Sequence, residues 1–154
     1  MLPIRRDIRF ALPAERIKDW HEQGPFITHF FNALSLLFPQ GELFFMDSVR
    51  HYRQRIDDPA LKKEIQGFIG QEAMHSREHV AYNDHLQAAG LPAHTLDRRL
   101  KFILDLQKKH LPPSFNLAVT IALEHYTAML AEILLSDPSR FGESLKGYRQ
   151  MWYW

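Results

Sequence analysis

The stretch GQEAMHSREHVAY, residues 70–82, constrains the fold most, because it places ionisable groups in an otherwise apolar helical stripe. Glu72, His75 and His79 are spaced i, i+3 and i+7, so they share one face of a helix. The stripe continues in both directions in the alternating steps of four and three residues that are typical of a core-facing helix. Its apolar members are Leu61, Ile65, Phe68, Tyr82 and Leu86.

A buried carboxylate at Glu72 needs a partner, because burying it alone costs several kcal/mol. Glu-x-x-His on an inward bundle face is the spacing of di-metal carboxylate proteins, and Glu72 and His75 have it. The stripe therefore predicts metal ligation. Two alternatives stay open at this point: a hydrogen-bonded polar pocket, or a helix rotated so that this face meets water.

Two further glutamates interrupt apolar helical stripes elsewhere in the chain. Glu42 and Glu124 lie on two other predicted helices, each flanked by apolar residues one turn away. A bundle that packs these stripes together brings three carboxylates close, and a divalent cation relieves their repulsion while also using His75. The prediction fails if the helices pack on other faces. His125 follows Glu124 directly, and it is expected at most to hydrogen-bond to a metal ligand without touching the metal. The flanking residues are Phe38, Phe45 and Val49 around Glu42, and Leu117, Ile121, Ala128, Ala131 and Leu135 around Glu124.

The composition narrows the classes of function. A chain of 154 residues favours one domain, and a net charge of +1 gives no reason to expect nucleic acid as a partner. There is no cysteine, which leaves a nitrogen and oxygen site suited to iron or manganese, with zinc as the alternative. The start has no signal-peptide pattern, and the most apolar segment, residues 25–38, is too short to span a bilayer. We therefore expect no membrane span and a cytoplasmic location.

The periodicity predicts an all-α protein, with no run of strand-like alternation. Residues 1–24 are expected to form an arm on a bundle domain of residues 25–154. A helix opens at Pro25, and Pro39 and Gly41 either kink it or stop and restart it. Asp58 is expected to cap the organising helix, which Gly90 ends. The predicted helices cover residues 25–38, 42–56, 59–89, 94–110 and 114–135, with another after Asp137-Pro138.

The segments FFNALSLLFPQGELFF (30–45), FIGQEAMHSREHVAYN (68–83) and ALEHYT (122–127) resemble the bacterial family of predicted metal-dependent hydrolases, a branch of the ferritin-like helical bundles. The resemblance implies Glu42, Glu72, His75 and Glu124 as catalytic metal ligands, with His79 as an additional ligand or a supporting group. Members of the family continue into a further helix with a Glu-x-x-His type motif, which this sequence lacks. We therefore expect a chain cut short, or a bundle that a second copy completes, and the aromatic end Met151-Trp152-Tyr153-Trp154 agrees with this.

Three functions compete for such a site. The first is hydrolysis, in which a metal site activates water. The family pattern implies that this site is dinuclear. The second is oxygen chemistry at two irons, acting on a hydrophobic substrate. The third is a non-catalytic helical module that binds a partner or stores metal. A hydrophobic small-molecule substrate is expected from aromatic residues near the proposed ligands, although such residues more often form core. They are Phe30, Phe31, Phe38, Phe44, Phe45 and Tyr126.

Overall fold

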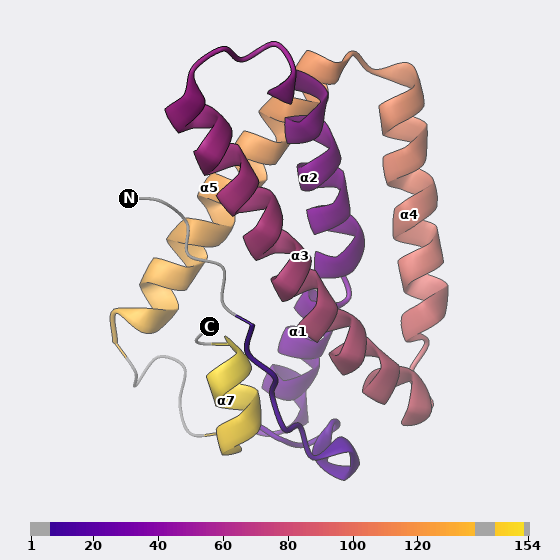
Figure 1. Ribbon diagram of the computed structural model, residues 1–154. Helices are drawn as coiled ribbons and strands as arrows, with labels where there is room; N and C mark the ends of the chain where they lie inside the picture. Colours follow the sequence, from indigo (N-terminus) through magenta and orange to yellow (C-terminus); the bar gives the residue numbers. More distant parts are fainter. Residues whose placement is uncertain (1–6, 138–143, 153–154) are drawn as a thin grey trace.

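The computed structural model describes residues 7–137 and 144–152, and these form an all-α helical bundle (Figure 1). In the described ranges the β pairing is limited to an isolated bridge between His21 and Ser144. The central pair, α2 and α3, carries the helices α1, α4 and α5 around it. The elements are a short 3-10 helix Ala14–Arg16, then α1 Pro25–Ser35, α2 Phe38–Arg53, α3 Pro59–Ala88, α4 Ala93–His110, α5 Pro113–Leu135 and α7 Lys146–Trp152.

The helix boundaries lie where the local sequence places them. Gly24, with a φ of 88°, turns the chain into Pro25 at the start of α1. α1 ends at Ser35 and α2 begins at Phe38, so the helix does stop and restart. The break lies at Leu36 and Leu37, however, and Pro39 and Gly41, the predicted points of interruption, lie inside α2. The Asp58 side chain accepts a hydrogen bond of 2.8 Å from the Ala60 amide, which caps α3 as expected.

The N-terminal arm packs into the core together with α7. Trp20 is buried and stacks on Tyr148 of α7, with 5.0 Å between the ring centroids. The Trp20 indole donates to Asn32 Oδ1 at 3.1 Å, and the Tyr148 hydroxyl donates to the Pro13 carbonyl at 2.8 Å. The two ends of the described chain are therefore held against α1 and α3 by aromatic packing and hydrogen bonds.

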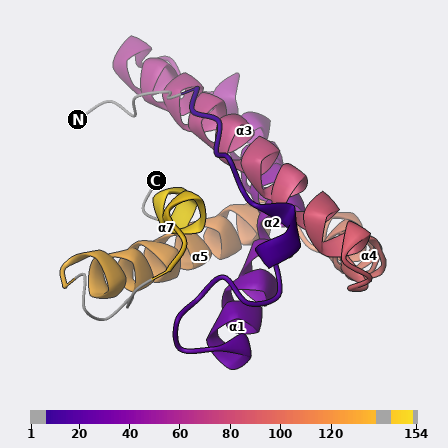
Figure 2. The ribbon, with the colours of Figure 1, turned by 90° about the horizontal axis from the view of Figure 1, so that it is seen from below.

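The predicted inward seam of α5 is wrong for most of its length. Ile121 is 61% exposed, and Leu135, Ala128 and Ala131 are exposed as well. The residues of α5 that are buried are instead Asn116 and Thr120. In both ribbon views the second half of α5 extends away from α2 (Figure 2). The helix is apolar around most of its circumference, so its pattern could not indicate which side has a neighbour.

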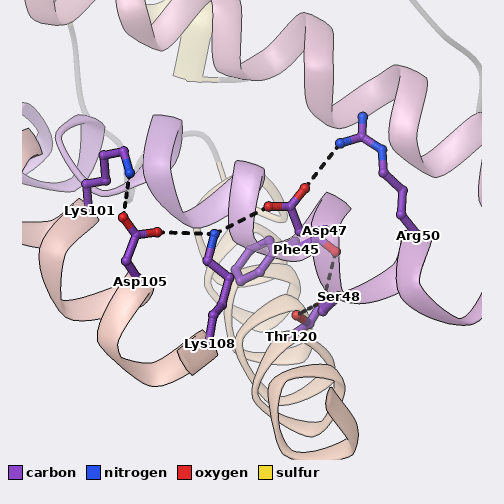
Figure 3. A network of polar contacts seen from close by, with 8 residues as sticks. All are labelled: Phe45, Asp47, Ser48, Arg50, Lys101, Asp105, Lys108 and Thr120. Carbon is purple, nitrogen blue, oxygen red and sulfur yellow. Dashed lines mark hydrogen bonds and ion pairs between the residues drawn. The ribbon is translucent and has the colours of Figure 1, made fainter. Parts of the chain in front are cut away.

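Polar contacts anchor the first half of α5 and the C-terminal end of α4 to α2 (Figure 3). Ser48 Oγ on α2 lies 2.6 Å from Thr120 Oγ1 on α5. Lys108 of α4 lies 3.4 Å from Asp47 of α2 and 3.3 Å from Asp105. On α4, the apolar side chains of Ile103 and Leu106 are likewise exposed to solvent.

Within the described residues, α5 is the helix long and apolar enough, by length and composition, to cross a membrane. Very little of it is buried in this structure, and helices of soluble bundles also meet that criterion. Completion of the bundle by a second copy of the chain stays a prediction, which sedimentation analysis of the protein in solution would check. Of the aromatic end, Trp152 packs on Phe31 with 4.9 Å between centroids, and Tyr153 and Trp154 lie outside the described residues.

Candidate metal centre

The structure brings together one glutamate of α2 with a glutamate and a histidine of α3. Glu42, Glu72 and His75 each offer one oxygen or nitrogen atom, and these atoms all lie within 4.8 Å of one another. Glu42 is 1% exposed and Glu72 is 8% exposed, so the two carboxylates lie in the dry interface between the helices. The i, i+3 spacing on α3 and the restart of the chain at α2 produce this arrangement.

Among the described residues, the ion-pair partner of Glu42 is His75, which compensates the charge only when its ring is protonated. Glu42 Oε1 lies 2.5 Å from Nδ1 of His75, yet neither carboxylate oxygen has a hydrogen bond of good geometry to the part of the chain that the structure describes. Burial raises the pKa of Glu42, and the adjacent His75 opposes that shift. A buried polar atom without a partner is rare in folded proteins and is often explained by an ion or a functional role.

The acidic neighbours make ionisation harder still. Burial first, and then the nearby charges of Glu124 and Glu42, raise the pKa of Glu72 to about 8. The pKa of Glu124 is also raised, by burial first and then by Glu42, while His75 lowers it. The three glutamates therefore converge closely enough to influence one another, although Glu124 on α5 is only half-buried.

An open groove of about 520 Å³ lies between α2, α3 and α5, and it reaches the acidic cluster at Glu124, whereas Glu42, Glu72 and His75 are not in its lining. Glu124 and Thr120 are on its α5 side, and the exposed Glu64 is on its α3 side. The rest of the lining is apolar, formed by Val49, Leu61, Ile65, Phe68, Leu117 and Ile121. The groove gives an apolar molecule access to the edge of the acidic cluster.

His79 lies next to this group, and both of its ring nitrogens already have hydrogen-bond partners. Its Nε2 is 3.2 Å from Nε2 of His75, and its Nδ1 is 2.9 Å from the Ser35 hydroxyl. Ser35 in turn donates to Asn83 Oδ1 at 2.9 Å. Burial and the neighbouring His75 lower the pKa of His79 well below its usual value, so the ring is neutral.

Ser35 and Asn83 are site residues that the sequence analysis missed. Asn83 follows His79 by four residues on the same helical face, a signal that could have been used. Ser35 carries no comparable signal, because it comes from another helix. The predicted supporting residue His125 is exposed on α5, and the aromatic residue Tyr126 is 68% exposed, so neither is buried with the carboxylates.

The residues present fit a divalent cation. The donor set consists of carboxylate oxygen and imidazole nitrogen, the ligand types that suit manganese, iron and zinc. A cation between the donors would also partner the unsatisfied oxygens of Glu42 and remove the cost of placing Glu72 beside two other acids.

Comparison with known proteins agrees with this chemistry. A family model described as predicted metal-dependent hydrolase matches residues 4–154. The chain belongs to this family. No curated protein and no solved structure matches the chain. The family of predicted metal-dependent hydrolases thus accounts for nearly the whole sequence, and the ligand roles of individual residues rest on the geometry described above.

Proposed function

We propose that this family member is a hydrolase whose divalent cation is held by Glu42, Glu72 and His75. The observation that supports this most directly is the cluster of three donor atoms within 4.8 Å of one another, around a buried glutamate whose oxygens lack hydrogen bonds. A cation bound by such ligands lowers the pKa of a water ligand and polarises a carbonyl or phosphoryl oxygen. Iron or manganese is the expected metal, with zinc as the alternative.

Glu124 is the residue of this chain best placed to move a proton. It is half-buried at the edge of the groove, on a different helix from the proposed ligands. Its pKa is raised by burial and by Glu42, which brings a carboxyl group closer to the working range of a general base. In this proposal Glu124 accepts a proton from the attacking water and returns it to the leaving group.

The groove supports a substrate with an apolar portion. Its lining is apolar apart from Thr120, Glu64 and Glu124, so a hydrocarbon chain would lie along it with the scissile group near Glu124. An ester of a medium-length acyl chain has this form.

Metal binding tests the first part of the proposal. Titration calorimetry with manganese and with zinc should show at least 100-fold weaker binding for Glu42→Gln and for Glu72→Gln than for the wild type. Glu64→Gln is the matched control, because Glu64 lines the same groove but is exposed on α3. Equal binding by all four proteins would refute the assigned ligands.

Hydrolysis tests the second part. With metal bound, kcat/KM for p-nitrophenyl esters should rise about 10-fold or more from acetate to octanoate, because each buried methylene contributes about 0.8 kcal/mol. Leu117→Asp should abolish this rise, whereas Leu123→Asp on the same helix, outside the groove, should preserve it. Phosphodiester substrates belong in the same assay, since the acidic cluster by itself does not select esters.

Oxygen chemistry is a second candidate, favoured by the number of carboxylates. Glu124 adds a third acid to a cluster that already has two carboxylates and an imidazole, and carboxylate-rich bundle sites are typical of di-iron proteins. Oxygen uptake by iron-loaded protein with a reductant and a fatty substrate, together with no ester cleavage, would favour it. Retained folding and unchanged stability in Glu72→Ala with His75→Ala, without either activity, would favour the non-catalytic module.

A further inference from the structure

A chain of buried hydrogen bonds runs from the end of α1 to the proposed ligand His75. It starts at Asn83, passes through the Ser35 hydroxyl and the His79 ring, and ends at Nε2 of His75. Ser35, Asn83 and His79 are all buried. Each group in this hydrogen-bonded series has few protons to donate. The direction of the first hydrogen bond therefore determines the direction of each later one.

The first link settles the orientation of the Asn83 amide. Its Nδ2 donates to the backbone carbonyl of Ser35 at 3.1 Å, and a carbonyl can only accept. That carbonyl belongs to the last residue of α1, where helix carbonyls lack intrahelical partners. Asn83 Oδ1 therefore faces the Ser35 hydroxyl and takes its single proton, at 2.9 Å.

The second link settles the His79 ring. With its proton given to Asn83, Ser35 Oγ can only accept from His79, so His79 carries its proton on Nδ1. A neutral ring with Nδ1–H has a lone pair on Nε2. The 3.2 Å contact to His75 then requires the proton on Nε2 of His75. Nδ1 of His75 lies 2.5 Å from Glu42 Oε1, so in the metal-free protein the two atoms share a proton, and Nδ1 offers its lone pair once a cation replaces that proton.

Packing holds the His79 ring in this orientation. Phe38 stacks on it with a centroid distance of 4.3 Å and an interplanar angle of 17°, and the Trp152 ring contacts it at 5.5 Å. These two aromatic rings come from α2 and α7, and Ser35 comes from α1. Three helices besides α3 therefore contribute to the position of the His79 imidazole.

We propose that Ser35, His79 and Asn83 are positioning residues, which keep His75 in the tautomer that presents its Nδ1 lone pair to the cation. In this proposal His79 is a supporting group and not a ligand. The proposal rests on the proposed metal centre. Groups that orient a ligand imidazole through its second nitrogen commonly change metal affinity by about 10- to 100-fold when removed.

Nitrogen NMR of the histidine rings tests the tautomers directly. Two-bond ¹H–¹⁵N correlation spectra of the metal-free and the zinc-loaded protein should show His79 with its proton on Nδ1. In the zinc-loaded protein His75 should carry its proton on Nε2, with its Nδ1 signal shifted by the metal. A proton on Nε2 of His79 would overturn the proposal, and a purely structural role for His79 predicts neither signature.

Ser35→Ala tests whether the Ser35 hydroxyl determines the tautomer of His79, with Ser48→Ala as the matched control. Both serines are buried, and Ser48 bonds Thr120 instead of the histidine chain (Figure 3). Ser35→Ala should lose the Nδ1–H preference of His79 and bind zinc about 10- to 100-fold more weakly, whereas Ser48→Ala should match the wild type. If Ser35→Ala fails to fold, the wild-type spectra still decide.

The outcomes separate this proposal from the metal centre itself. Zinc binding by the wild type with an Nε2-protonated His79 would overturn the positioning role and leave the metal centre standing. Failure of zinc, manganese and iron to bind the wild type would refute the metal centre. The positioning role proposed for Ser35, His79 and Asn83 would then also be refuted, whatever the spectra show. Equal zinc affinity of the wild type and a folded Ser35→Ala would also overturn the positioning role.

Discussion

Helix α3 buries two glutamates whose surroundings differ sharply. Glu78, which is 5% exposed, contacts Arg77 Nε at 2.8 Å and accepts from the Phe10 amide at 3.3 Å. Glu72, six residues earlier, is buried to a similar extent but has two other acids, Glu42 and Glu124, as its main electrostatic neighbours. The protein thus supplies its own counter-charge for Glu78, the guanidinium of Arg77.

This difference separates a carboxylate that is paired within the structure from one that we propose as a metal ligand. Arg77 also reaches Asp7 at 2.6 Å and the Ile8 carbonyl at 2.8 Å, so Glu78 belongs to a network that attaches the N-terminal arm to α3. Among residues 7–137 and 144–152, Glu72 takes part in no comparable ion-pair network, and its burial costs folding free energy in the absence of a cation. Charge placed at such a cost is typical of binding and catalytic sites.

The largest expected effect is on the pH dependence of stability without metal. The folded-state pKa of Glu72, about 8, lies above its ordinary value of 4.5, so its favourable contribution is complete below pH 4 and is lost as pH rises toward 8. Glu72→Gln should therefore be more stable than the wild type by about 3 kcal/mol at pH 7 and equal to it near pH 4. Urea unfolding with a chelator present, at both pH values, measures this. Parallel pH profiles for the two proteins would contradict the assignment.

Metal should remove most of that difference in stability. At a free concentration about 100 times Kd, a cation that binds only the folded state adds about 2.7 kcal/mol to the wild type. Glu72→Gln should gain little, because it lacks one of the proposed ligands. Urea unfolding at pH 7 with saturating manganese measures the gain, and an equal gain in both proteins would show that Glu72 is not a ligand.

A smaller effect of opposite sign is expected for the paired carboxylate. Glu78→Gln should destabilise the protein by about 1 to 2 kcal/mol, because it loses charge-assisted hydrogen bonds to Arg77 while the amide oxygen still accepts from Phe10. The loss should be the same with chelator and with manganese. A loss that appears only with metal would place Glu78 in the metal centre and remove the contrast between the two residues.

The smallest effect is expected for an exposed ion pair. Lys101 and Asp105 lie one turn apart on the solvent side of α4, with a nitrogen to oxygen distance of 2.5 Å (Figure 3). Solvent and salt screen such pairs, so Lys101→Met should leave the urea midpoint unchanged within error. A clear drop would mean that Lys101 holds α4 on the bundle through the neighbouring Asp105 and Lys108.

The sequence was sufficient for the features that depend on local chemistry. Pro25, Asp58 and Gly90 begin or end helices because their backbone preferences and caps act within a few residues. The spacing of Glu72 and His75 places them on one helical face wherever that helix packs. The membership of the family could likewise be inferred from the segments that carry these residues.

Tertiary structure alone decided which neighbours those faces meet. The apolar pattern of α5 could not show that most of its predicted seam faces solvent while Asn116 contacts α4 and Thr120 contacts α2. A helix that is apolar on most sides has no unique inward direction. Nor could spacing separate His75 from His79. That distinction depends on Ser35, which comes from another helix and engages the second nitrogen of His79. Contacts between residues far apart in sequence decide the direction of a hydrogen bond, and no periodicity within one helix contains that information.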